Sequence, residues 1–189
     1  MAKSAELKSL FATVDTAART RNGPAVVEHV DRATRAYFDR IRQHALDTPE
    51  TDLRSLPLVE KAHVLLARSI FPVGQLEAMD GAELLSKLVA AGLIQFGFQL
   101  GDFRLAVEEA HAAVVHPSVA MPPSVEVRFH FEDDRWCLGH DGWIEATALL
   151  YAKEIEGSDE TGDTALLLLL ESKLNRPLPE TVWTPPIRA

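Results

Sequence analysis

The chain has 189 residues, of which 47% are hydrophobic and 25% are charged, a composition typical of a globular protein with one compact domain. Its formal net charge of −9 argues against nucleic-acid binding, because phosphate contacts need a clustered cationic face. Cys137 is the only cysteine, which excludes an intrachain disulfide and favours a reducing, cytoplasmic compartment.

Two amphipathic helices are predicted at the N-terminus. The first has apolar residues at three- and four-residue intervals and ends at Asn22-Gly23, a pair that favours a left-handed cap. Pro24 opens the second, which continues as one helix and stops before Thr48. Both helices have an apolar face, so both must cover another part of the fold.

A polar connection over residues 47–55 separates these two helices from two more. Ser55 is the expected N-cap of the third helix, which ends at Phe71. The fourth starts with a capping-box-like pattern at residues 80–83, in which a carboxylate follows the N-cap acceptor by three positions. Residues 1–92 therefore predict a helical layer.

The apolar period then changes to two, which predicts an antiparallel sheet over residues 93–140. Gly101-Asp102 is expected to be a two-residue hairpin loop, because only this register puts every apolar side chain on one face. The pairs would be Leu100 with Phe103, Phe98 with Leu105, and Phe96 with Val107. A bend at 108–109 then shifts the apolar phase to Ala110, Ala112 and Val114.

A second hairpin is predicted around Asp133-Asp134, since apolar and polar residues alternate on both sides of this pair. Its register has four pairs: Phe129 opposite Leu138, His130 opposite Cys137, Phe131 opposite Trp136, and Glu132 opposite Arg135. The last of these pairs is expected to be a cross-strand ion pair.

Residues 141–189 predict two helices and an extended, proline-rich tail. The second helix contains five consecutive leucines, so it lies either deep in the core or at a subunit contact. Its apolar run at 165–170 is far shorter than the about 20 residues that a membrane span needs. The candidate interface residues are Leu166, Leu167, Leu169, Leu170 and, as the anchor of the tail, Trp183.

The cross-strand neighbours His130 and Cys137 are the first candidates for chemistry. An imidazole beside a thiolate could hold zinc or form an activated nucleophile, with His140 and Asp141 just beyond the strand. His116, on the preceding strand, could be a third metal ligand. The alternative is a histidine and a small cysteine in ordinary packing contacts, since no paired CxxC or HExxH spacing is present. We therefore predict no metal, no cofactor and no catalytic residue, with these five side chains as the ones to test.

Other residues give further expectations about where a ligand could bind. His29, His44 and His63 lie on helices among polar residues and are expected to face solvent. Six aromatic residues share the apolar face of the sheet and either line a ligand pocket or form plain core. They are Phe96, Phe98, Phe103, Phe129, Phe131 and Trp136.

Over residues 60–140, the order of elements and the motifs AHAAVV (110–115) and VEVRFHFEDDRWCL (125–138) resemble the NTF2-like (SnoaL-like) superfamily. The resemblance implies a cone-shaped fold, frequent dimers, and either ligand binding or no catalysis. Two features depart from the family pattern: a short strand among the early helices is missing, and the C-terminal helices are an addition.

The sequence predicts a single α+β domain over residues 1–189, with N-terminal helices packed on a curved antiparallel meander of about four strands. For function, the first hypothesis is a non-enzymatic cytoplasmic protein that binds a small ligand or a protein partner, as a homodimer. The alternatives are a small NTF2-like enzyme with a pocket on the curved sheet, and an immunity- or chaperone-like acidic partner protein.

Overall fold

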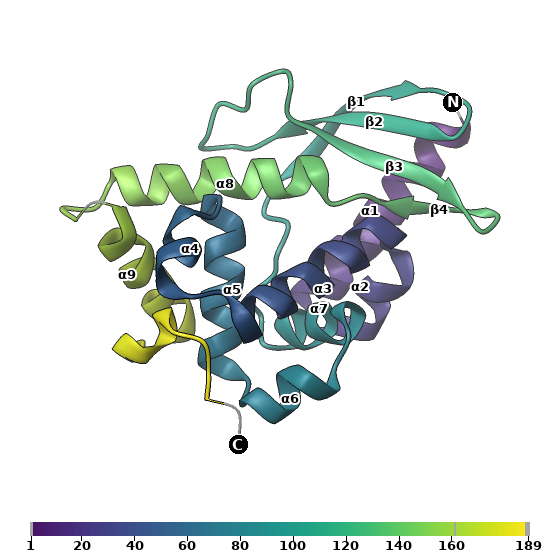
Figure 1. Ribbon diagram of the computed structural model, residues 1–189. Coiled ribbons are helices and arrows are strands. Elements are labelled where there is room, and N and C mark those ends of the chain that lie inside the picture. The colour runs from purple at the N-terminus through teal and green to yellow at the C-terminus, as the bar shows by residue number, and fades with distance from the viewer. Residues whose placement is uncertain (1, 161, 188–189) are drawn as a thin grey trace.

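A computed structural model describes residues 2–160 and 162–187. Helices fill the first half of the chain, the sheet follows, and two helices with a short 3-10 turn end it (Figure 1). The N-terminal helices are α1 (Ala2–Arg19), α2 (Gly23–His29), α3 (Arg32–Asp47), α4 (Glu50–Ser55), α5 (Leu58–Ile70), α6 (Val73–Ala78) and α7 (Gly81–Ala90).

The four strands form one antiparallel sheet in the order β1-β2-β3-β4, which confirms the predicted α+β class. They are β1 (Gln99–Leu105), β2 (Glu109–Val115), β3 (Glu126–Glu132) and β4 (Arg135–Leu138). The C-terminal elements are α8 (Asp141–Glu156), α9 (Gly162–Leu174) and η1 (Glu180–Trp183). The sheet lies at one end of the molecule, and α8 runs past β3 towards α9 (Figure 1).

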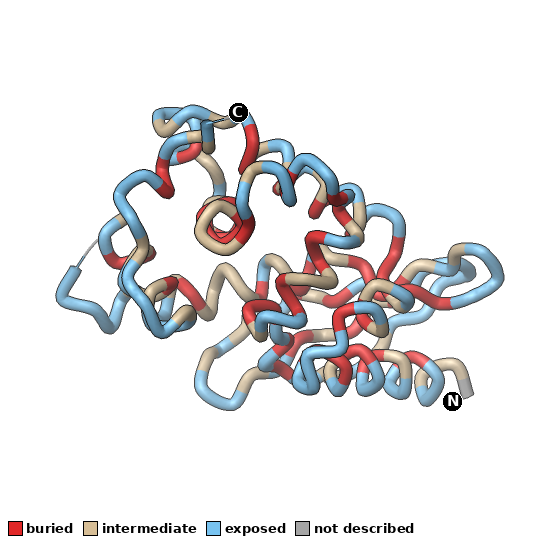
Figure 2. Tube along the Cα trace, turned by 90° about the horizontal axis from the view of Figure 1, so that it is seen from below, coloured by how far each residue is buried: buried red, intermediate tan, exposed pale blue. Residues whose placement is uncertain are grey.

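The core is apolar and continuous from the helices to one face of the sheet. Buried residues alternate with exposed ones along the helices in Figure 2, which is the pattern of elements that cover one another with a single face. In the sheet this face carries Ala110, Ala112, Val127 and Phe129. None of the described helices has the length and apolarity to cross a membrane.

The second predicted helix is in fact two helices. Val30 is extended and pairs in parallel with Leu138 at the edge of β4, and Asp31 caps the new helix α3 by accepting a hydrogen bond from the Thr34 backbone N–H. The helical spacing continued across this break, so periodicity alone could not reveal it. The left-handed residue before α2 is Arg21, with φ of 59°, whereas Asn22 is the N-cap of α2.

Two short helices were also missed, because Pro49 and Pro72 were interpreted only as ends of the preceding helices. Residues 47–55 contain α4, and α6 follows Pro72. Ser55 is not a cap: α5 begins three residues later, after Pro57. Proline fits a position just before a helix because its fixed φ suits the start of a helix. The predicted cap at Asp80 is confirmed, since its carboxylate accepts the Glu83 N–H at 2.8 Å.

The predicted hairpin at Gly101-Asp102 is wrong. Strand β1 passes through this pair with an irregularity between Leu100 and Phe103, and it pairs with β2 rather than with residues 94–98. The turn lies further on, where the Ala106 N–H donates to the Glu109 carbonyl. The apolar side chains of 94, 96 and 98 are buried as expected, but outside the ladder; Phe96 and Phe98 both contact Phe11 of α1. The alternating pattern therefore correctly indicated buried side chains, although residues 94–98 are not part of the strand ladder.

The second hairpin has the predicted register at all four pairs, including His130 with Cys137. Asp133 and Asp134 have φ of 50° and 62°, as a two-residue hairpin loop requires. The Glu132 side chain, however, turns to α3, where it accepts the Arg32 backbone N–H at 3.1 Å instead of forming the expected ion pair with Arg135. The hairpin loop is thus attached to the start of α3.

Helix α9, which contains the five consecutive leucines, packs against other parts of the same chain. Leu166 and Leu170 are buried, Leu167 and Leu169 are half-buried, and the neighbouring Leu168 is 47% exposed. Trp183 is buried as the predicted anchor of the tail, with the Arg54 guanidinium 4.1 Å from its ring centroid.

Candidate functional site

His130 and Cys137 lie opposite each other in the predicted register, but the surroundings do not activate the thiol. Cys137 is buried, and burial raises the pKa of its thiol, which keeps the sulfur protonated and weakly nucleophilic. His130 instead binds a residue that the sequence had not indicated. Its Nδ1 lies 2.7 Å from Oδ2 of Asp31, whose side chain is fully buried.

The carboxylates around His130 have structural partners. Asp31, His130 and Glu132 have ligand atoms within 4.8 Å of one another, which a metal ion could use. Asp31, however, accepts the Thr34 N–H, and Glu132 accepts the Arg32 N–H, so both carboxylates already cap α3. The positive end of the helix dipole favours these anions and disfavours a cation. The cluster is therefore a capping device that attaches β3 to α3.

The other candidates from the sequence have partners of their own, and the structure brings two of them together, with His140 Nε2 3.3 Å from Oδ1 of Asp141. His140 stacks on Tyr37, with ring centroids 5.0 Å apart, and burial lowers its pKa. Asp141 forms an ion pair with Arg128 at 3.4 Å. Both line a shallow hollow of about 370 Å³ beside α3 and α8. His116 lines a different and larger cavity, so no three of these residues form a metal site among the described parts of the chain.

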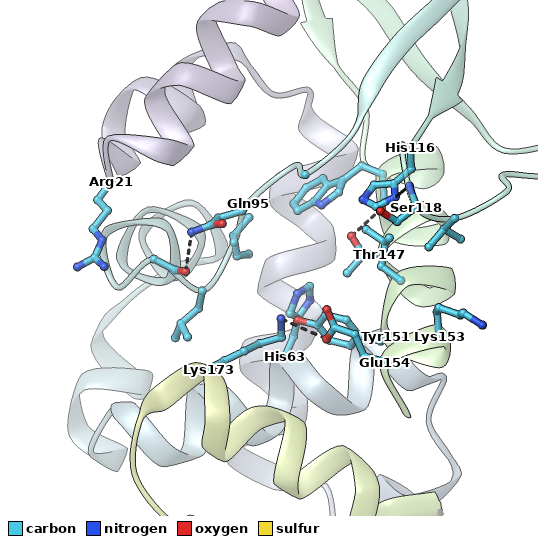
Figure 3. Close-up of a pocket in the computed structure, with 17 residues that line it drawn as sticks. Arg21, His63, Gln95, His116, Ser118, Thr147, Tyr151, Lys153, Glu154 and Lys173 are labelled. Atoms are coloured by element: carbon cyan, nitrogen blue, oxygen red, sulfur yellow. Dashed lines mark hydrogen bonds and ion pairs between the residues drawn. The ribbon is translucent and has the colours of Figure 1, made fainter. Parts of the chain in front are cut away.

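The larger cavity, of about 740 Å³, is the candidate functional site. It lies between the segments 92–97 and 116–119 on one side and α8 and α9 on the other, with α5 contributing His63 (Figure 3). This volume is in the range of small-molecule sites. Its apolar lining consists of Leu93, Ile94, Val119, Trp143 and Leu150, and its uncharged polar lining includes His63, Gln95, His116, Ser118, Thr147 and Tyr151.

His63 was expected to face solvent, and this prediction is wrong. The residue is 3% exposed and burial lowers its pKa to about 4, so its imidazole is neutral at pH 7. Its Nδ1 lies 3.0 Å from the Tyr37 hydroxyl, and burial raises the pKa of this phenol, which keeps its proton. A neutral imidazole has one donor and one acceptor nitrogen. The Tyr37 hydroxyl can donate to Nδ1, and in that tautomer the ring proton lies on Nε2 and is available to the cavity.

A second group of polar side chains gathers near His63 at the same end of the cavity (Figure 3). The Lys173 ammonium is 4.9 Å from the Tyr151 ring centroid and 3.7 Å from Oε2 of Glu154. Burial raises the pKa of Tyr151 to about 12, so its hydroxyl stays protonated. This end can therefore donate hydrogen bonds from a neutral imidazole, a phenol and an ammonium.

The six aromatic residues proposed from the sequence line neither of these two cavities. Phe96, Phe98 and Phe129 are buried in the core, and Phe103 packs against Phe129 with ring centroids 5.8 Å apart. Phe131 is 42% exposed and stacks edge-on with Trp136. Trp143 lines the large cavity instead, although nothing in its spacing had distinguished it.

A pH titration tests the buried state of His63. In the unfolded chain this histidine takes up a proton near pH 6.5, whereas in the folded chain it does so only near pH 4. The unfolded state therefore binds more protons in this window, and stability falls as the pH is lowered through it. Relative to His63→Gln, wild type should lose about 3 kcal/mol of unfolding free energy between pH 7 and pH 4.

Urea denaturation at both pH values measures this difference. His44→Gln is the matched control, because His44 is half-buried and its Nδ1 contacts Thr48 on the same helix end. An equal pH dependence in wild type and His63→Gln would show that His63 is not held neutral in the folded protein.

Comparisons with protein-family models, with curated proteins and with solved structures found no match for this chain.

Proposed function

We propose that this protein binds a small organic molecule in the cavity of about 740 Å³. One observation carries the proposal: a buried histidine lines the cavity while one of its ring nitrogens is held by Tyr37. The other ring nitrogen, Nε2, is not among the buried atoms that lack a partner, so water in the cavity can reach it. A ligand acceptor at Nε2 would replace this water, and the apolar walls would hold the rest of the molecule.

Binding is better supported than catalysis by the same geometry. A histidine with a pKa of about 4 is a poor proton acceptor near pH 7, but it is a good neutral hydrogen-bond donor. The enzyme alternative relied on His130, Cys137, His140 and Asp141, and these residues do not line the large cavity. The polar groups that do line it are suited to holding a ligand in one orientation.

A neutral fluorescent dye, N-phenyl-1-naphthylamine, tests the proposal directly. Its fluorescence should rise with saturation at one dye per chain, and Thr147→Phe should weaken binding by about tenfold or more by filling the cavity. Thr147 lines the cavity and its hydroxyl donates to the Trp143 carbonyl, so Thr147→Val is the control that keeps the volume and loses only this bond. Equal dye binding by Thr147→Phe and wild type would contradict the proposal.

The other expectations from the sequence stay predictions. A homodimer through α9 is favoured by Leu168, which is half exposed beside buried leucines. An acidic partner protein is favoured only by the net charge of −9. The cytoplasmic location and the NTF2-like resemblance of residues 60–140 likewise remain predictions.

A further inference from the structure

We propose that the molecule bound in this cavity is an organic anion with an apolar body and one acidic head group. This inference rests on the proposed function, because it names the chemical class of the ligand for the same site. Three features of the lining support it: the balance of charge, the donors at one end, and the apolar wall beside them.

The charge of the lining is opposite to that of the whole protein. The chain carries a net charge of −9, yet the charged side chains around the cavity are three cations and one carboxylate. The cations are Arg21, Lys153 and Lys173, and the carboxylate is Glu154. An acidic protein that concentrates cations around one concavity attracts anions there and repels them elsewhere.

The ion pair of Lys173 and Glu154 does not cancel this preference. The Glu154 side chain is 51% exposed and the Lys173 side chain 31% exposed, so water screens the carboxylate more than the ammonium. A cationic ligand would also compete with Lys173 for Glu154. An anionic head group would instead give Lys173 a second partner, one that is less hydrated than the Glu154 carboxylate.

The donors near Lys173 match such a head group. His63 and Tyr151 lie beside Lys173 at the same end of the cavity (Figure 3). Both are neutral at pH 7 and each carries one hydrogen that it can donate, because burial lowers the pKa of the imidazole and raises that of the phenol. A carboxylate accepts several hydrogen bonds and donates none, so it fits a set of donors better than an alcohol or an amine does.

The apolar wall sets the second requirement. Ile94, Trp143 and Leu150 line the cavity together with Leu93 and Val119. A small inorganic anion would leave this wall in contact with water only, whereas a ligand with a hydrocarbon or aromatic body would bury it. The observations therefore favour an amphiphilic monoanion over a free phosphate or a sugar.

Three ligands with the same eight-carbon chain test the inference: octanoate, octanol and octyltrimethylammonium. Each displaces N-phenyl-1-naphthylamine in a competition titration, so that differences report the head group alone. We expect octanoate to bind about tenfold more tightly than octanol, and octyltrimethylammonium to bind most weakly. Equal binding of octanoate and octanol, or preference for the cation, would overturn the anion assignment while leaving cavity binding intact. Failure of all three, and of the dye, would overturn the proposed function itself.

Lysine variants test the position of the head group. Lys173→Met keeps the aliphatic part of the side chain and should weaken octanoate by about tenfold without changing octanol. Lys153→Met is the comparison, because it removes the same charge from the rim but from a side chain that points away from His63 and Lys173 (Figure 3), so it should weaken octanoate less. Equal losses in both variants would show a diffuse charge effect and would contradict the placement of the head group.

Discussion

Replacing Gly142 by alanine should destabilise the protein by about 3 kcal/mol or more, because the added methyl group has no space. Gly142 lies in the first turn of α8, where a Cβ atom would stand 1.8 Å from the Glu126 carbonyl oxygen and 2.7 Å from the Val127 nitrogen. These atoms are backbone atoms of β3 and cannot rotate away. The whole helix would have to move from the sheet.

This substitution should also reduce ligand binding, since α8 carries Trp143, Thr147 and Tyr151 of the cavity lining. Gly74→Ala in α6 is the control, because a Cβ atom there meets nothing within 4 Å. This variant should be as stable as wild type or slightly more stable. Urea denaturation of both variants gives the free energies of unfolding. Similar values for the two would mean that α8 does not pack on β3 as closely as described.

Replacing Asp31 by alanine should cost about 3 kcal/mol of unfolding free energy, more than the loss of an ordinary helix cap. The carboxylate is fully buried and serves two elements at once. It caps α3 through the backbone N–H of Thr34, 2.7 Å away, and contacts His130 of β3 at the same distance. Its removal leaves the His130 ring nitrogen and the Thr34 backbone N–H without this partner.

Asp80→Ala separates the contribution of a helix cap from that of the contact with β3. Asp80 is exposed and caps α7 by accepting the Glu83 N–H at 2.8 Å, so its loss should cost only about 1 kcal/mol. Chemical denaturation at one pH compares the two variants. If Asp31→Ala costs no more than Asp80→Ala, the contact between α3 and β3 adds nothing to stability.

The β3–β4 hairpin was predictable because its sequence allows only one register. Alternation on both sides of Asp133-Asp134 fixes every pair, and both aspartates tolerate the left-handed backbone of the loop. The earlier hairpin was not, since the apolar residues at 94, 96 and 98 are buried equally well outside the ladder, with Phe96 and Phe98 against α1. Alternation indicates which side chains are buried, but not which strand lies beside them.

The candidate site was largely beyond sequence reasoning, because it is assembled from segments far apart in the chain. Asp31 is a helix cap because the chain breaks between α2 and α3. This break lies inside a continuous helical pattern, and the tertiary pairing of Val30 with Leu138 creates it. His63 did leave a signal: the stretch AHVLLA contains no charged residue, and every one of its six positions is buried. A histidine inside such a stretch is more consistent with burial than with exposure.

The most direct test of ligand binding in the cavity is an NMR titration of the three tryptophan indoles with N-phenyl-1-naphthylamine. Trp143 lines the cavity, whereas Trp136 packs on Phe131 and below Lys3, and Trp183 packs under Arg54. Variants with phenylalanine at 136 and 183 assign the ¹⁵N-indole signals. We predict that the Trp143 signal shifts with saturation at one dye per chain while the other two stay in place. An unchanged Trp143 signal with the dye bound, or equal shifts of all three, would contradict binding in this cavity.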